Sequence, residues 1–217
     1  MNWGRHRHGH HEHRDRYHHG NLREALLEAA TQLIRENGPN GFSFAQVARH
    51  AGVSPAAPYR HFRDRTALVA EVARLGFEKF ESELRGAWRD GEPDPRQAFS
   101  ACGRAYLRFA RTHPAVYSAM FEPSLPLDEE PGLRAASDRA FDVLLQAAER
   151  LCADIEEEQR PPARMVALHV WALSHGIASL FVVGNGARSI PGSPEEMLEA
   201  AVLIYLAGLS RAATKTS

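Results

Sequence analysis

Helical periodicity runs through almost the whole chain from Leu22 onward, and this periodicity limits the possible fold more than any other feature. Leu22, Leu26, Ala29 and Leu33 are spaced by four, three and four residues, which places them on one face of a helix. Nowhere do apolar and polar side chains alternate over the length of a strand. The sequence therefore predicts an all-α fold.

Glycines, prolines and capping residues divide this pattern into separate helices. Asn21 is the expected N-cap of the first helix, Asn37-Gly38-Pro39 its expected end, and Ser43 the expected cap of a short second helix. A third short helix is expected to reach about Phe62. The later helices are expected over residues 67–88, 95–111, 114–121, 132–153, 162–184 and 194–212.

The first 19 residues differ in composition from the rest of the chain. They contain seven of the twelve histidines and almost no apolar side chains, so we expect a His-rich disordered arm. The two cysteines, Cys102 and Cys152, fit neither a disulfide framework nor a zinc motif. No apolar stretch is long enough to span a bilayer and no secretory signal is visible, so we expect a cytoplasmic protein without a membrane partner.

The net charge of −1 hides an asymmetry along the chain. Residues 1–80 contain twelve Lys and Arg against eight Asp and Glu, whereas residues 81–217 contain fourteen against nineteen. The first third is therefore suited to an anionic partner such as a nucleic acid, and the remainder is not.

The stretch "GVSPAAPYRHF" (residues 52–62) has the spacing of a helix-turn-helix, in which the start of the third helix faces the base edges of DNA. We expect Ser54 to cap this helix and Pro55 to occupy its first position, where no N–H is needed. Pro58 then falls in the fourth position and removes only the first hydrogen bond of the ladder. Phe62 is expected to return to the core.

The side chains of this stretch suit contact with a duplex. Ala56 and Ala57 are small enough for the backbone to come close to the bases, and an alanine methyl can meet a thymine methyl. Tyr59, Arg60 and His61 offer hydroxyl, guanidinium and imidazole groups to phosphates or bases. The sequence thus predicts double-stranded DNA as a partner.

The longer stretch "FSFAQVARHAGVSPAAPYRHFRDRTALVAEV" (residues 42–72) closely resembles the helix-turn-helix region of TetR-family transcriptional regulators. The matching residues are Ser43, Val47-Ala48, Ala51-Gly52-Val53-Ser54, Tyr59, His61-Phe62 and Leu68. The resemblance covers about residues 20–79 and implies a DNA-binding domain over residues 20–80, with its motif at about 42–61. The chain departs from the family pattern at two positions. Pro58 stands where the family usually has an apolar residue. Arg65 replaces a phosphate-binding lysine and keeps its charge, so the resemblance implies a phosphate contact for Arg65 as well.

For residues 81–217 the resemblance implies a helical domain for ligand binding and dimerisation. The stretch "VWALSHGIASLF" looks like the signature of a WHG-type C-terminal domain. Trp171 and His175 share a helix face, and His175 beside a tryptophan either hydrogen-bonds a ligand or is a core histidine satisfied by a backbone carbonyl. The candidate effector-binding residues are Tyr106, Phe109, Met120, Trp171 and His175, and each of them also suits a place in the core.

The segment 194–212 is apolar nearly all round at its centre, so we expect it to be buried in a core or against a second subunit. In proteins similar to TetR, the last two helices of each subunit form a four-helix interface. The resemblance therefore implies a homodimer, with candidate interface residues Ala201, Val202, Tyr205, Leu206 and Leu209.

The function that the sequence favours is a ligand-responsive repressor that binds a palindromic operator as a dimer and is released by a small-molecule effector. A metal-responsive regulator using "HRHGHHEH" stays open, because imidazoles suit zinc, nickel and copper. An enzyme is not expected, since no known catalytic motif is present, and no catalytic residue, metal ligand or cofactor is assigned. The arm is expected either to assist DNA binding or to be an idle tail.

Overall fold

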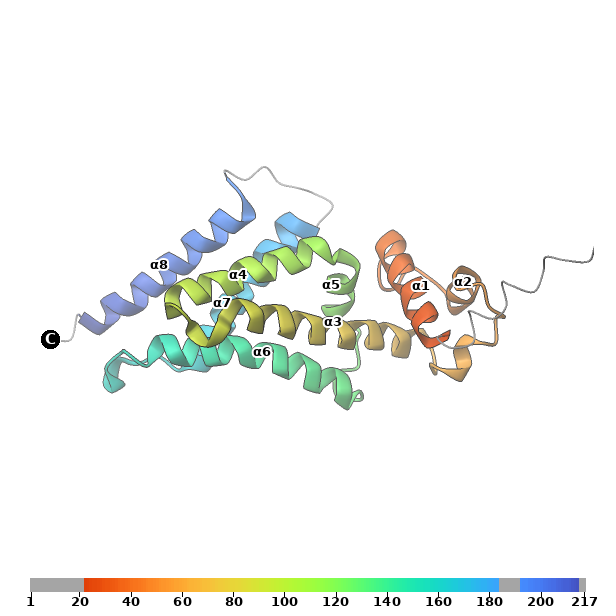
Figure 1. Cartoon of the computed structure of the whole chain (residues 1–217), viewed down its shortest axis with the longest axis horizontal. Coiled ribbons are helices and arrows are strands. Elements are labelled where there is room, and N and C mark those ends of the chain that lie inside the picture. The colour runs from red at the N-terminus through yellow and green to blue at the C-terminus, as the bar shows by residue number, and fades with distance from the viewer. Residues whose placement is uncertain (1–21, 184–191, 215–217) are drawn as a thin grey trace, which may run out of the picture.

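The chain is elongated and helical, with a small group of helices at one end and a larger helical body at the other (Figure 1). The structure is a computed structural model that describes residues 22–183 and 192–214. These residues form eight α-helices and no strand, as the periodicity predicts. The expected arm, residues 1–19, and the expected cap Asn21 lie outside the described residues.

The small group consists of α1 (Leu22–Asn37), α2 (Phe44–His50) and a 3-10 turn, η1 (Pro58–Arg60). It has its own apolar interior, to which Leu26, Val47 and Phe62 contribute buried side chains. Ser43 caps α2 as expected: its hydroxyl accepts from the backbone of Gln46, whose side chain accepts from the backbone of Ser43.

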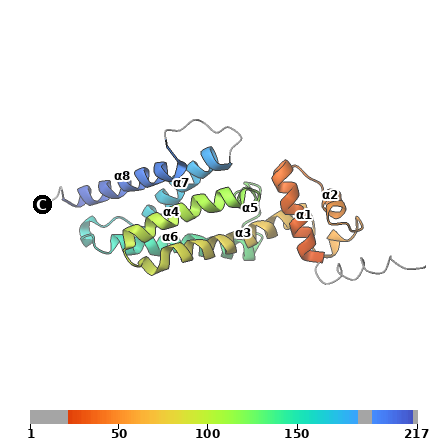
Figure 2. The same cartoon turned by 45° about the horizontal axis from the view of Figure 1, so that its top comes forward.

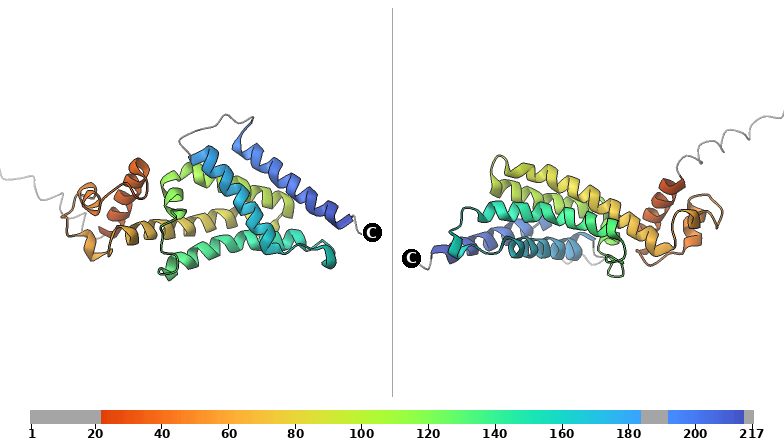
Figure 3. Two further views of the ribbon diagram at one scale, coloured as in Figure 1. Left: turned by 180° about the vertical axis from the view of Figure 1, so that it is seen from behind. Right: turned by 90° about the horizontal axis from the view of Figure 1, so that it is seen from below.

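The long helix α3 (Arg65–Trp88) runs from this small group into the body (Figure 2). The body continues with α4, α5, α6, α7 and α8, over Pro95–Thr112, Pro114–Met120, Pro131–Cys152, Ala163–Ile177 and Pro194–Thr214. A π-helical turn, Ala178–Val183, extends α7 to nearly the end predicted for it. Helices α7 and α8 pack side by side along one flank of the body (Figure 3).

Short polar residues and prolines set where these helices begin. Asp64 accepts a hydrogen bond from Ala67 N at 2.8 Å, and Asp94 accepts one from Gln97 N at 2.9 Å. The hydrogen bond from the Ala67 backbone is the main reason that the pKa of Asp64 is lowered. Because such caps are local in sequence, they explain why most helix boundaries were predictable.

A left-handed turn joins α3 to α4. Arg89, the C-cap of α3, has φ 48° and ψ 42°, and Asp90 follows with φ 54°. Left-handed backbone is unfavourable for a residue with a Cβ by about 1–2 kcal/mol, and glycine is the usual residue at the end of a helix. The chain therefore holds Arg89 in a conformation that its side chain disfavours.

Arg89→Gly is expected to raise the free energy of unfolding by about 0.5–1 kcal/mol, because relief of the left-handed strain exceeds the extra backbone entropy of glycine. Urea unfolding with an unchanged m-value measures the effect. Arg85→Gly, in the last turn of α3, is the matched control and should lower stability by about 1 kcal/mol. Equal losses in both variants would contradict the assignment of strain.

Candidate nucleic-acid interface and aromatic site

The segment after α2 is less helical than the sequence predicts. The predicted helix from Pro55 to Phe62 is wrong in extent, since only Pro58–Arg60 is helical. The N-cap of this short turn is Ala57, and no side chain caps it. Pro58 has no N–H with which to reach the Ser54 carbonyl, so the Ala57 N–H bonds to that carbonyl instead, at 3.0 Å. The two prolines thus convert the start of the helix into tight turns of the 3-10 type.

This turn nonetheless presents the predicted side chains at the end of the molecule. Tyr59 is 63% exposed, and its ring rests edge-on against Phe44 with the centroids 4.8 Å apart. Pro58 and Phe62 are buried and anchor the turn to the small helical group. The other exposed residues of the stretch are Ser54, Pro55, Ala56, Arg60 and His61, while Ala57 is half-buried.

The stretch of sequence that contains this turn lacks carboxylates. No Asp or Glu occurs between Glu36 and Asp64, whereas the interval contains three arginines and two histidines. All five of these side chains are exposed: Arg49, His50, Arg60, His61 and Arg63. An exposed surface that is locally cationic and carboxylate-free is suited to phosphate oxygens.

Arg65, for which the resemblance implies a phosphate contact, has a partner within the protein. Its guanidinium donates to the carbonyl of Pro39 at 2.8 Å and lies over the ring of Phe42, 5.8 Å from the centroid. Burial raises the pKa of Glu122 nearby, but hydrogen bonds, including one from Asn40, and the charge of Arg65 lower it overall. Arg65 therefore ties the start of α3 to the loop after α1, and its charge acts on Glu122 in the loop after α5.

Three of the candidate effector residues, Tyr106, Trp171 and His175, meet at the centre of an aromatic cluster inside the body. The hydroxyl of Tyr117 is hydrogen-bonded to Nδ1 of His175 at 2.8 Å, and the hydroxyl of Tyr106 lies 3.3 Å from the same nitrogen. The rings of Phe80 and Tyr106 pack against Trp171, with centroids 6.2 and 5.9 Å from it. His175 is thus satisfied by tyrosine hydroxyls rather than by a backbone carbonyl.

The remaining members of this cluster show where sequence reasoning was incomplete. Phe109 packs on Phe80 at 4.9 Å, and Met120 is buried. Tyr117 was missed, as was Phe121, whose ring centroid lies 4.5 Å from that of His175. Both belong to "YLRFARTHPAVYSAMF" (residues 106–121), a stretch that also contains three of the predicted residues.

Ionisation of the cluster follows from its burial. Burial raises the pKa of Tyr117 to about 12 and that of Tyr106 well above its usual value, so both hydroxyls keep their protons. Burial lowers the pKa of His175, which favours the neutral ring. At neutral pH the cluster therefore combines a large apolar surface with a few uncharged polar groups.

The free energy of unfolding should fall as the pH drops below about 6.5, because His175 resists protonation in the folded state and not in the unfolded state. His175→Gln should reduce this slope, which cannot exceed about 1.4 kcal/mol per pH unit for one group. Part of the slope should remain in this variant, because the pKa of His113 is also lowered mainly by burial. Urea titrations between pH 7.5 and 5.5 measure the slopes, with His50→Gln as control, and equal slopes in all variants would contradict the prediction.

Helices α7 and α8 share an exposed apolar face. It contains Met165, Leu168, Ala172 and Leu180 from α7 and its extension, and Ala200, Leu203, Ile204, Ala207 and Gly208 from α8. Leu203 and Ile204 are 64% and 75% exposed. The α8 residues repeat at spacings of three and four, so they form one helical stripe.

Two of the predicted interface residues face inward instead. Val202 is only 5% exposed and belongs to the core. Tyr205 is half-buried, and its hydroxyl lies 2.9 Å from Nδ1 of His169 on α7. Ala201 is also half-buried, while the side chains of Leu206 and Leu209 lie outside the described residues. The sequence did not predict which side of α8 is exposed.

Residues 22–183 and 192–214 contain no group of three or more His, Cys, Asp or Glu placed to hold a metal ion. None of the helices described is both long and apolar enough to traverse a bilayer.

Several curated relatives of the chain are transcriptional regulators. It is 30% identical to the regulator BetI of Cronobacter sakazakii over 174 residues, covering 73% of this chain and 74% of that protein. It is 26% identical over 194 residues to the transcriptional activator FasR of Mycolicibacterium smegmatis, covering 87% and 83%. The match to the uncharacterized regulator YobS of Bacillus subtilis, at 27% identity, spans 46% of this chain and about half of that relative, 51%.

A solved structure has the same architecture over nearly the whole chain. The structure of a protein of unknown function from Rhodococcus sp. RHA1 aligns with a TM-score of 0.71 and 31% identity, covering 89% of this chain and 98% of that one. Residues 26–72 match the bacterial regulatory proteins of the tetR family, and residues 99–205 match the tetracyclin repressor-like C-terminal domain. The chain belongs to the TetR family of helix-turn-helix transcriptional regulators.

Proposed function

We propose that this regulator is a ligand-responsive repressor that binds a palindromic DNA operator as a homodimer and leaves it when a small molecule binds. The observation that carries the proposal is the cationic, carboxylate-free turn around Tyr59, at the end of the molecule farthest from the apolar face of α7 and α8 (Figure 1). One end is suited to DNA and the other to a second subunit.

The DNA contacts are assigned by side-chain chemistry. Arg60, His61 and the hydroxyl of Tyr59 are proposed to contact phosphates or bases, and Ala56 and Ala57 to allow the turn to come close to base edges. Ser43, Ser54 and Pro55 are proposed to shape the same surface. Arg65 is proposed to hold the DNA-binding group against the body rather than to contact DNA, because its guanidinium is bonded to Pro39.

The dimer is proposed to form through the apolar face of α7 and α8. This face includes Leu168, Leu203 and Ile204, and the small residues Ala200 and Ala207 would let two helices come close together. Exposed contiguous apolar surface of this kind is typical of an interface. A two-fold axis through it would present two recognition turns to two half-sites of an operator.

The effector is proposed to bind in the aromatic cluster around Trp171 and His175. The aromatic rings favour a largely apolar molecule, and the neutral His175 and the hydroxyl of Tyr117 favour a single polar group on it. This ligand must bind the DNA-free arrangement more tightly than the DNA-bound one, because only differential affinity releases DNA.

Contacts along α3 and α5 provide a physical link between this cluster and the DNA-binding group. Helix α5, which contains Tyr117, packs against both α1 and α3. A Cβ on Gly76 of α3 would lie only 2.5 Å from Val116, so the two helices are in close contact there. Movement of α5 on ligand binding would therefore shift α1, and with α1 the rest of the DNA-binding group, including the turn around Tyr59.

Experiments decide two further questions: whether the protein represses or activates transcription, and whether it responds to a metal instead of an organic effector. FasR is described as an activator, so transcription from the operator must be measured with and without the protein. The operator is first selected from genomic fragments by retention on the protein, and its affinity is measured by fluorescence anisotropy, with and without chelator. Specific binding that survives chelator supports the proposal, and binding lost on chelation supports a metal-responsive regulator through the His-rich arm.

A further inference from the structure

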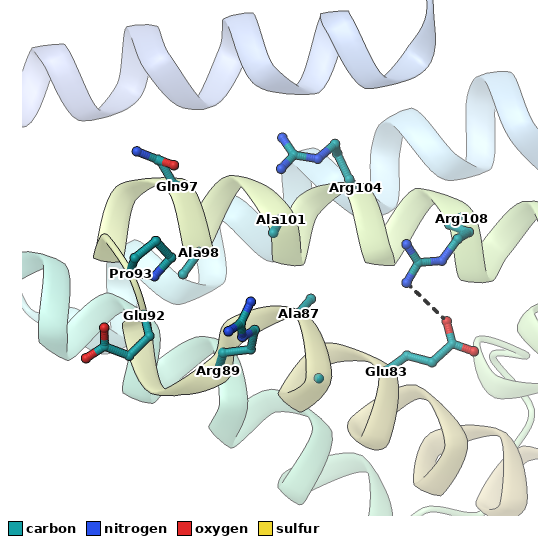
Figure 4. Close-up of a pocket in the computed structure, with 11 residues that line it drawn as sticks. Glu83, Ala87, Arg89, Glu92, Pro93, Gln97, Ala98, Ala101, Arg104 and Arg108 are labelled. Carbon is teal, nitrogen blue, oxygen red and sulfur yellow. Dashed lines mark ion pairs between the residues drawn. The ribbon is translucent and has the colours of Figure 1, made fainter.

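A second candidate site lies away from the aromatic cluster, between the C-terminal half of α3 and the N-terminal half of α4. It is an open cavity of about 600 Å³ (Figure 4). This volume is typical of cavities that hold small molecules. The cavity takes no part in the DNA-binding turn, the aromatic cluster or the apolar face described above.

The floor of this cavity is made of small residues from both helices. Gly86 and Ala87 contribute from α3, and Ala98 and Ala101 from α4. None of these four positions has a long side chain, and the methyl groups of the three alanines are apolar. A flat ring system can lie on such a floor with contact over its whole face.

Arginines line the rim of the cavity. Arg89, Arg104 and Arg108 face only two carboxylates there, those of Glu83 and Glu92. Two of the arginines already have partners: Arg108 lies 3.8 Å from Glu83, and Arg104 forms an ion pair with Glu199 on α8 at 2.6 Å. With Glu199 counted, three arginines and three carboxylates balance, and among the described residues Arg89 is the arginine of this rim that forms no ion pair.

Arg89 is the arginine of this rim that is available to a ligand. In Figure 4 its side chain lies between the end of α3 and the start of α4, at the mouth of the cavity. Within the two described ranges of the chain it takes part in no ion pair. An exposed guanidinium in this place offers a fork of N–H donors that matches a carboxylate or a phosphate.

The backbone at Arg89 is a second and independent observation. Arg89 and Asp90 both have positive φ, 48° and 54°, in a position where glycine would be free of strain. Strained residues of this kind are concentrated at ligand-binding and switch regions. Here the left-handed conformation places a guanidinium, rather than a bare glycine, at the cavity.

We propose that this cavity binds a small organic anion. Its flat apolar body lies on the floor formed by Gly86, Ala87, Ala98 and Ala101, and its carboxylate or phosphate binds Arg89, with Arg108 beside it. The site is separate from the effector site proposed above and does not depend on it.

Isothermal titration calorimetry on the full chain tests the proposal with four probes. The probes are 2-naphthoate, adenosine 5′-monophosphate, inorganic phosphate and the uncharged 2-naphthalenemethanol. We expect saturable binding of 2-naphthoate or adenosine monophosphate, and the better of the two identifies the acid group as carboxylate or phosphate. Inorganic phosphate and the alcohol should bind at least about tenfold more weakly, since each lacks one half of the ligand.

Variants locate the binding. Arg89→Gln and Arg89→Gly should each weaken the preferred probe about tenfold or more, and the glycine variant does so without strain in the backbone. Arg85→Gln, on the same helix but outside the cavity, is the matched control. No saturable binding of either organic anion below about 10 mM, or equal binding in wild type and both Arg89 variants, would overturn the proposal. Loss of probe binding in the His175→Phe variant, with unchanged probe binding in Arg89→Gln, would also overturn the proposal, because the probe would then occupy the aromatic cluster.

Discussion

Replacing Leu203 and Ile204 together by glutamate should convert the dimer into monomers and lower operator affinity by about 100-fold or more. Both side chains are largely exposed on α8, at 64% and 75%, so the folded subunit should tolerate the change. In the proposed dimer the same positions are buried, and an unpaired charge there is strongly unfavourable. A monomer also loses the advantage of binding two half-sites at once.

Sedimentation equilibrium at micromolar concentration and anisotropy with the operator measure the two effects. Leu75→Glu with Leu127→Glu is the matched control, because these leucines are also exposed, each at 39%, but lie outside the α7–α8 face. Wild-type mass and affinity in the L203E/I204E variant would remove this face from the proposed interface. Val202→Asp should instead unfold the subunit, since Val202 is in the core.

The second large effect is expected at the recognition turn. Ala56→Glu places a bulky carboxylate on an exposed position of a surface that lacks carboxylates, where it would clash with base edges and repel phosphates. We expect operator affinity to fall about 100-fold or more, with little change in thermal stability. Ser82→Glu, an exposed position on α3 in the body, adds the same charge as a control.

Anisotropy at several salt concentrations separates the contributions to this effect. Arg60→Gln should weaken binding to every sequence and reduce the salt dependence by about one unit if it neutralises a phosphate. Ala57→Leu should instead affect the operator more than random DNA, because it prevents close contact with the bases. Unchanged operator affinity in all three variants would contradict the assignment of the turn as the DNA contact.

The helix boundaries were largely predictable because their causes are local in sequence. Asp94 and Pro95 begin α4, and Trp88 ends α3, where the sequence places them. The exception is the third helix, where Pro55 and Pro58 act together. Pro55 alone fits the start of a helix, but Pro58 three residues later removes the first N–H of the α-helical ladder, and only a 3-10 turn forms.

The sites were less predictable because they depend on contacts between distant segments. His175 was identified from its place beside Trp171, but its partner Tyr117 lies 58 residues away. Helix α8 is apolar on several sides, so periodicity could not distinguish Val202, which is buried, from Leu203, which is exposed. Arg65 has a charge suited to phosphate, and only the fold reveals its bond to Pro39.

The footprint of the protein on its selected operator tests the central proposal most directly. Hydroxyl-radical footprinting with the wild-type chain should protect two half-sites related by a two-fold axis, spaced by about one helical turn of DNA or a multiple of it, with two protomers bound. The Ala56→Glu variant should protect neither half-site at the same concentration. A single protected site occupied by one protomer, or a footprint that Ala56→Glu leaves unchanged, would contradict the account.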